Sequence, residues 1–317
     1  MPTWVNFLVI VATIFLVGLG AHWVVESSSR LAKRFGVSEL VIGLTVVAFG
    51  TSAPEFAVTL IAAFRGQGDI SVGNIVGSNI FNLGFILGGC AMVRAIPVSR
   101  ALLWRDGTVL GATTLLLLAM IGWDLTLSRV DGVILFTLLG VYLGFLYKYR
   151  HTVGDEDSPV VGEGADLSLW HNGALLVLGL AAIVVGSNLL IGSATAVARA
   201  FGISDWVIGV TIVAAGTSAP EFATSLMAVI RGRYGISVGN LVGSNIFNLL
   251  GVLGLAGMLH PVTIAPMARV SLAALTGMVF LVLILMRTGW RISRLEGLIL
   301  FLVAAGMWTL DFTIHSP

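Results

Sequence analysis

The chain has 317 residues, of which 57% are hydrophobic and only 10% are charged, and its mean hydropathy is +1.01. This composition excludes a water-soluble domain and indicates a membrane protein that crosses the bilayer many times. The net charge of +1 gives no electrostatic reason to expect a nucleic-acid partner. The single cysteine, Cys90, excludes an intramolecular disulfide.

Charged and turn-forming clusters divide the chain into ten apolar spans that are long enough to cross the hydrocarbon. They lie near residues 4–32, 38–64, 70–93, 101–123, 130–149, 169–198, 204–230, 236–259, 267–287 and 293–314. The first span exceeds the core of a signal peptide and is expected to be retained. We therefore predict an all-α membrane protein with ten transmembrane helices.

The positions of the basic residues predict the orientation of these helices. With the N-terminus outside, the outer loops contain only Arg65, Arg129, Arg199 and Arg269, and the other 13 of the 17 Lys and Arg residues lie inside. The positive-inside rule then predicts that both termini are extracytoplasmic and that the protein resides in the cell membrane. The acidic stretch 151–168 is expected to be a cytoplasmic linker.

Two blocks of sequence occur twice, at the same offset of 166 residues. GTSAPEFA stands at residues 50–57 and again at 216–223, and VGSNIFNL stands at 76–83 and again at 242–249. Each half of the chain therefore holds five predicted helices. Because five is an odd number, the halves are inverted repeats, and a substrate site is expected where they meet near the bilayer midplane. The halves are residues 1–150 and 169–317.

Glu55 and Glu221 lie inside otherwise apolar spans. An ionisable group there costs at least about 2.5 to 3.5 kcal/mol, and neither span contains a Lys or Arg. Protons or metal ions remain as partners. Pro54 and Pro220 each free a backbone carbonyl four residues earlier, so helices 2 and 7 should break there. We expect helices 2, 3, 7 and 8 all to be broken around a central ion site.

Hydroxyl, amide and carboxylate side chains recur four residues apart in the repeated blocks, which places each pair on one helical face. The pairs are Thr51 with Glu55, Ser78 with Asn82, Thr217 with Glu221 and Ser244 with Asn248. These hard oxygen donors suit Ca2+ and Na+ and not soft metals. For the serines alone, helix packing explains their presence equally well.

Charge balance indicates what such a site would do. One Ca2+, two Na+ or two protons would each neutralise two ionised glutamates, so these ions would compete and be exchanged. A cation channel with a ring of charge is an alternative, and it would conduct without a counter-ion. An intramembrane hydrolase with paired carboxylates is less favoured, because acid catalysis does not require the duplicated hydroxyls and amides.

At these motifs the chain resembles the cation/Ca2+ exchanger superfamily, in its prokaryotic Na+/Ca2+ exchanger branch, over essentially its whole length. The resemblance implies ten helices, four central ion sites, helices 1 and 6 sliding as a gate, and exchange of extracellular Na+ for cytosolic Ca2+. It implies no prosthetic group, and a monomer suffices for the mechanism. It also implies a ligand set of Glu55, Glu221, Asn82, Asn248, Thr51, Ser52, Ser78, Thr217, Ser218 and Ser244, with the carbonyls of Ala48 and Ala214.

Asn82 and Asn248 separate this chain from nearby branches. Some family members have Asp at the position of Asn248, and K+-dependent exchangers use Asp nearby, so two amides predict no K+ requirement. The Ca2+/H+ exchanger branch is the closest alternative, although its usual Gly-Asn-Ala-Ala-Glu type of motif is absent here. His22 and Glu26, four apart on the first span, are expected to form a local hydrogen-bonded pair near the gate.

Overall fold

The computed structural model describes residues 3–149, 168–201, 214–266 and 268–315, and almost all of them are helical. The predicted linker at 151–167 and the first part of the seventh predicted span, at 204–213, lie outside these residues. The helices are α1 (Thr3–Phe35), α2 (Glu39–Ile42), α3 (Ala48–Thr51), α4 (Ala53–Phe64), α5 (Gly68–Phe81), α6 (Leu87–Val93), α7 (Thr108–Asp124), α8 (Arg129–Lys148), α9 (Leu169–Ala200), α11 (Ala214–Thr217), α12 (Ala219–Ile230), α13 (Tyr234–Ile246), α14 (Leu253–Leu259), α15 (Ala268–Arg287) and α16 (Arg294–His315). Wider π-helical turns are η1 (Gly43–Val47), η2 (Asn82–Ile86), η3 (Leu102–Gly107) and η5 (Phe247–Val252).

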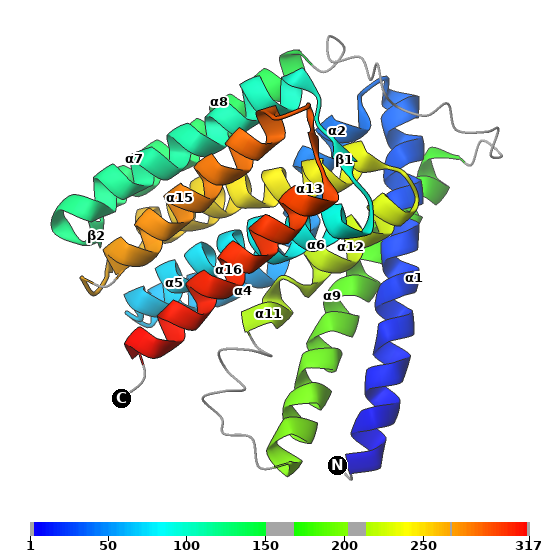
Figure 1. The fold of residues 1–317 in the computed structure, drawn as a ribbon, viewed down its shortest axis with the longest axis horizontal. Coiled ribbons are helices and arrows are strands. Elements are labelled where there is room, and N and C mark those ends of the chain that lie inside the picture. Colours follow the sequence, from blue (N-terminus) through cyan, green and yellow to red (C-terminus); the bar gives the residue numbers. More distant parts are fainter. Residues whose placement is uncertain (1–2, 150–167, 202–213, 267, 316–317) are drawn as a thin grey trace.

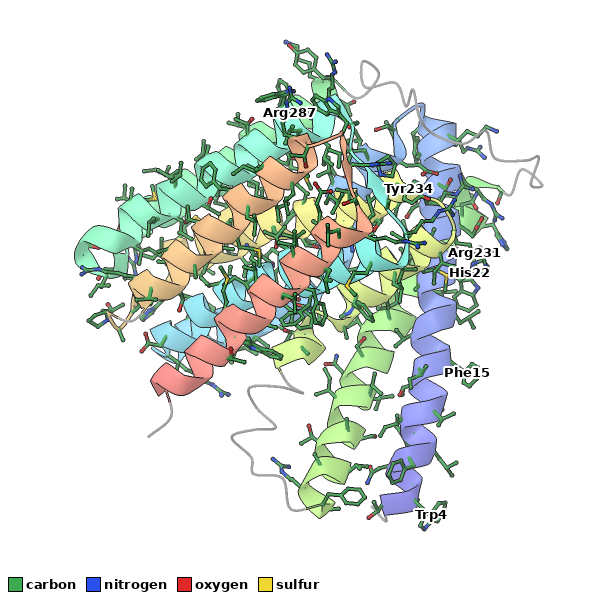
Figure 2. All side chains as sticks on the ribbon, in the orientation of Figure 1. Trp4, Phe15, His22, Arg231, Tyr234 and Arg287 are labelled. Carbon is green, nitrogen blue, oxygen red and sulfur yellow. The ribbon has the colours of Figure 1, made fainter. Side chains whose placement is uncertain are left out.

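Among the described residues, seven helices are long and apolar enough to cross a membrane, or eight if the bent helix at 39–64 is counted. Two other predicted spans coincide with α12 and α16, and the count alone does not reach ten. Large apolar side chains cover the outside. Trp4 and Phe15, for example, project from α1 away from the other helices (Figure 2) and are 64% and 75% exposed. An apolar exterior of this kind requires lipid, so the protein is an all-helical membrane protein.

Two of the four predicted helix breaks occur. The helix at 39–64 bends by 51° at Ser52, and Ser218 separates α11 from α12 with nearly the same backbone angles. In each case a proline follows within the first two helical positions, where it lacks no hydrogen-bond partner. The predicted breaks in helices 3 and 8 were wrong. Those spans are continuous over Gly68–Val93 and Tyr234–Leu259, because no proline interrupts them and the π-helical turns η2 and η5 absorb the irregularity.

The helices form two packed groups (Figure 1). The larger core joins α5, α6, α13 and α14 to α7, α8, α15 and α16, and a smaller one joins α1, α2, α9 and α12. α1 and α9 lie side by side on one flank of the molecule, away from α7 and α8 on the other. Gly20 and Gly179 allow this close approach, since a Cβ on either would lie 2.8 Å from the other's carbonyl oxygen.

Two short strand pairs connect the two halves of the chain. β1 (Ile96–Pro97) pairs with β4 (Arg291–Ile292), and β2 (Thr126–Leu127) pairs with β3 (Val262–Thr263). The first pair joins Ile96 to Ile292 and the second joins Leu127 to Val262. Ile96 and Val262 are 166 residues apart, and Leu127 and Ile292 are 165 apart. The repeat therefore converts one pair into the other, which indicates two-fold pseudosymmetry.

A buried ion pair joins the halves at the start of α2. Arg233 Nη1 lies 3.1 Å from Glu39 Oε1, and Ser29 Oγ of α1 donates to the same oxygen at 2.5 Å. α13, which follows Arg233, lies directly against this segment, and a Cβ at Gly239 would come within 2.6 Å of the Leu40 carbonyl oxygen. One end of the molecule is thus closed by charge pairing and close backbone packing.

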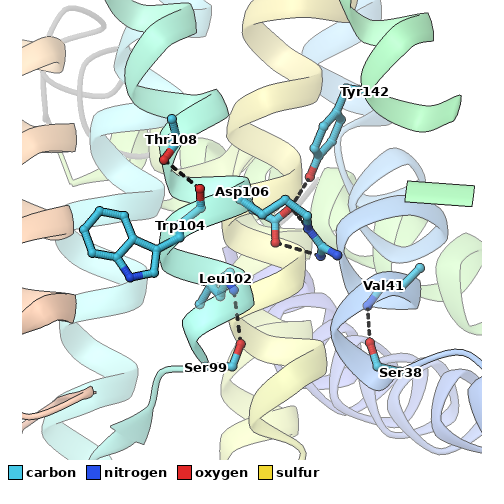
Figure 3. Close-up of polar contacts among 9 residues, drawn as sticks. Ser38, Val41, Ser99, Leu102, Trp104, Asp106, Thr108 and Tyr142 are labelled. Carbon is cyan, nitrogen blue, oxygen red and sulfur yellow. Dashed lines mark hydrogen bonds and ion pairs between the residues drawn. The ribbon is translucent and has the colours of Figure 1, made fainter. Parts of the chain in front are cut away.

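Asp106, in η3, is a second buried acid with a basic partner (Figure 3). Its Oδ1 accepts from Arg105 Nε at 2.8 Å and from the Tyr142 hydroxyl at 3.0 Å, and its Oδ2 accepts from Arg105 Nη2 at 2.9 Å. Both carboxylate oxygens are therefore satisfied, and the cluster ties η3 to α8. Sequence reasoning did not single out Asp106 or Glu39.

We predict that Glu39→Gln lowers the free energy of unfolding by about 3 kcal/mol, because it leaves the Arg233 guanidinium buried without a counter-charge. The matched control is Glu26→Gln, which removes a partly exposed pair with Arg30 and should cost less than about 1 kcal/mol. Thermal unfolding of the purified protein in detergent measures both. Equal losses for the two variants would contradict the assignment of a buried pair.

Candidate cation site

The two helix breaks lie against each other at the centre of the molecule. Ser218 Oγ, at the second break, donates to Glu55 Oε1 at 3.2 Å, and Ser52 Oγ, at the first, donates to Glu221 Oε1 at 3.1 Å. All four side chains are completely buried. Each half therefore supplies the hydroxyl that binds the other half's carboxylate, and the two bonds are exchanged by the 166-residue offset.

Helix termini contribute to this arrangement. Glu55 and Glu221 lie in the first turns of α4 and α12, immediately after the breaks. The first backbone N–H groups of a helix have no partner within it and carry partial positive charge. The breaks thus place each carboxylate where a helix favours negative charge.

Further hydroxyls surround Glu221. Ser244 Oγ lies 3.4 Å from Glu221 Oε1 and 3.4 Å from the Ala48 carbonyl oxygen. Thr51 Oγ1 donates to Asn240 Oδ1 at 3.0 Å and lies 3.5 Å from Ser244 Oγ. α3, α12 and α13 therefore meet at one polar point inside an apolar protein.

Four buried oxygens at this centre have no hydrogen-bond partner. They are Glu55 Oε2, Glu221 Oε2, Asn82 Oδ1 and Asn248 Oδ1. The set is symmetric, since two of these residues come from each half. A buried polar atom without a partner is costly and calls for a ligand, and carboxylate and amide oxygens are the donors that hard cations prefer. The centre therefore fits a small hard cation as its substrate.

The other buried acids make the contrast clear. Of the four buried acids among the described residues, Glu39 and Asp106 each pair with an arginine. No ion pair within the described parts of the chain includes Glu55 or Glu221. The charge of these two glutamates is left for a mobile ion to balance.

Most residues predicted for the site do meet at this centre. Glu55, Glu221, Thr51, Ser52, Ser218, Ser244 and Ala48 are joined by the contacts above, and Asn82 and Asn248 lie in η2 and η5. The Ala48 carbonyl already accepts from the Ser52 N–H at 3.1 Å and from Thr51 Oγ1 at 3.3 Å. Ser78 is buried on α5, Thr217 is half-buried at the end of α11, and Ala214 begins α11.

Three asparagines at the centre were missed by sequence reasoning. Asn240 Nδ2 donates to Ser225 Oγ at 3.0 Å and lies 3.4 Å from the Glu221 carbonyl oxygen. Asn79 and Asn245 contact the ion-facing amides of the opposite half. The available signal was the repeat itself, because Asn79 and Asn245 belong to the duplicated VGSNIFNL block.

The expected hydrogen-bonded pair of His22 and Glu26 does not form. His22 Nδ1 is buried without a hydrogen-bond partner, and Glu26 Oε2 lies 3.8 Å from Arg30 Nη2, one helical turn further along α1. Arginine is always charged and reaches further than histidine, so Glu26 turns towards it. The four-residue spacing allowed either contact.

Apolar helices around a buried, oxygen-rich centre define a membrane protein that handles cations, and comparisons with known proteins specify the class. Residues 5–148 and 171–310 match the family model described as sodium/calcium exchanger protein. The putative antiporter CaxA of Alkalimonas amylolytica is 38% identical over 325 residues, covering 96% of this chain and 99% of that protein. The sodium/calcium exchanger MaX1 of Methanosarcina acetivorans is 32% identical over 336 residues, covering 94% and 96%.

A solved structure extends the similarity to the fold. The sodium-calcium exchanger NCX_Mj, soaked with 2.5 mM Na+ and 0.1 mM Ca2+, is similar with a TM-score of 0.83 at 32% identity, covering 99% of each chain. The chain therefore belongs to the sodium/calcium exchanger family. This is a family of transporters and not a class of enzymes.

We predict that Asn240→Ala lowers the free energy of unfolding by about 1 to 2 kcal/mol, because Thr51 and Ser225 each lose a buried hydrogen-bond partner. Asn74 stands at the equivalent position of the first half, is less buried and donates to Thr59 Oγ1 at 3.0 Å. Asn74→Ala should cost about 0.5 kcal/mol. Thermal unfolding compares the two, and a larger loss at Asn74 would refute the central role given to Asn240.

Proposed function

We propose that the protein is a secondary antiporter that exchanges Na+ for Ca2+ at the centre between Glu55 and Glu221. The observation that carries the proposal is the symmetric set of four buried oxygens without hydrogen-bond partners. Two ionised carboxylates give the site a formal charge of −2, which one Ca2+, two Na+ or two protons neutralise. Ions that compete for the same oxygens exchange for one another.

The transport mechanism we propose is alternating access by two inverted five-helix halves, 1–150 and 169–317, with ten transmembrane helices and a linker at 151–168. The reciprocal Ser–Glu hydrogen bonds and the exchanged strand pairs support this symmetry. In such a protein each half can adopt the conformation of the other, so an outward-open state implies a related inward-open state. α1 and α9 would slide as the gate.

The ligand set comprises the two glutamates and the oxygens around them. Glu55 and Glu221 are the principal Ca2+ ligands and also take part in Na+ binding, and Asn82 and Asn248 complete the centre. The further oxygens proposed are those of Thr51, Ser52, Ser78, Thr217, Ser218, Ser244 and the carbonyls of Ala48 and Ala214. An exchange cycle that carries more than two Na+ per Ca2+ moves net charge and responds to voltage.

We further propose that the protein lies in the cell membrane with both termini extracytoplasmic. The excess of Lys and Arg in the loops of the opposite side supports this orientation. The ion pair of Glu39 with Arg233 then closes the cytoplasmic end in the conformation described here.

Sealed vesicles test the counter-ion directly. We expect radioactive Ca2+ uptake that requires an outward Na+ gradient. A proton gradient that replaces the Na+ gradient would identify a Ca2+/H+ antiporter instead. Ca2+ conductance without any counter-ion gradient would identify a channel and overturn the proposal.

The same vesicles test the K+ requirement. Because Asn82 and Asn248 are neutral amides, we expect the Na+-driven uptake rate to be unchanged when K+ is removed from both sides. Strict dependence of uptake on K+ would contradict this part of the proposal.

We predict that Glu55→Gln and Glu221→Gln each reduce Ca2+ transport at least about 100-fold, since each removes half of the site's charge and a charged ligand. The control is Glu296→Gln, because Glu296 caps α16 through the Ser293 N–H at 2.7 Å and does not contact the centre. That variant should transport within about twofold of wild type, as expected for a capping contact of modest strength. Transport preserved in a folded Glu55→Gln protein would remove the assignment.

A further inference from the structure

Four asparagines form a closed cluster where the two halves meet. Asn79 and Asn82 come from α5 and η2, and Asn245 and Asn248 come from α13 and η5. All four are completely buried. Only Asn82 and Asn248 are proposed ion ligands above, so the presence of the other two at the same point needs its own explanation.

Each proposed ligand amide is held by its nitrogen. Asn248 Nδ2 donates to Asn79 Oδ1 at 3.0 Å, and Asn82 Nδ2 lies 3.4 Å from its acceptor, Asn245 Oδ1. Both bonds cross between the halves and are exchanged by the 166-residue offset. With the nitrogen of each amide occupied, its oxygen points the other way, and both oxygens are buried without a partner.

Asn79 is itself fixed in orientation. Its Nδ2 donates to the backbone carbonyl of Asn245 at 3.3 Å, so its Oδ1 must face Asn248. Asn245 has no such anchor, since its own Nδ2 is buried without a hydrogen-bond partner. Asn79 is therefore the more rigid of the two.

We propose that Asn79 and Asn245 are positioning residues that determine which end of each ligand amide faces the cation. An amide attracts a cation through its oxygen and repels it through its NH2 group. Without a fixed acceptor for the nitrogen, the amide could turn and convert a ligand into a repulsive group. The inference rests on the proposed function, because it concerns the same cation site.

A carboxylate at the ligand position provides a direct test. Its two oxygens are equivalent as ligands, so it needs no orienting acceptor. Loss of Asn79 should therefore matter with Asn248 in place and matter little with Asp in its place. A purely structural role for Asn79 would give the same loss in both backgrounds.

The experiment measures Ca2+ affinity of the purified full-length protein by calorimetry in a double-mutant cycle. We expect Asn79→Ala to weaken Ca2+ binding about tenfold in the wild-type background. In the Asn248→Asp background the same change should weaken binding less than about twofold. Equal factors in both backgrounds, or unchanged affinity for a folded Asn79→Ala protein, would overturn the inference.

Two controls keep the result interpretable. Asn74→Ala removes an amide from the same helix, where it bonds Thr59, and should leave Ca2+ affinity within about twofold, because a partner in the machinery is not touched. The reciprocal cycle of Asn245→Ala with Asn82→Asp replaces the first if Asn79→Ala does not fold, and it should show the same pattern. Absence of Ca2+ binding by the wild-type protein would instead refute the proposed function.

Discussion

The burial of two carboxylates without basic partners is the constraint on which the rest of this structure depends. Glu55 and Glu221 are completely inaccessible to solvent, and each has one oxygen bound by a serine of the other half and one oxygen free. Charge in an apolar interior is tolerated only when it is paired. The serines satisfy geometry and not charge, so the neutralising ion must come from outside the chain.

The helix breaks exist to serve those carboxylates. Ser52 and Ser218 stop one helix and start another, which places Glu55 and Glu221 at helix beginnings. The same residues then reach across to the opposite half. One local irregularity thus supplies the favourable helix terminus, the hydroxyl donor and the change of direction that brings the two halves together.

The neighbouring polar groups of the protein are fully paired, and this separates structure from function. Asp106 with Arg105 and Tyr142, and Glu39 with Arg233 and Ser29, satisfy their charges within the protein. These clusters hold helices in place. At the centre, by contrast, the unpaired atoms are all oxygens of Glu55, Glu221, Asn82 and Asn248, apart from the Asn245 nitrogen.

The sequence by itself determined the membrane class, the duplication and the two glutamates, because hydrophobic spans, an exact repeat and costly buried charges are all visible in composition and spacing. Only the tertiary structure decided how the halves interlock. Helices 3 and 8 remain continuous, Glu26 turns to Arg30, and Asn79 and Asn245 reach across to the ligand amides. Contacts between residues far apart in the chain depend on how helices pack, and no local pattern encodes that packing.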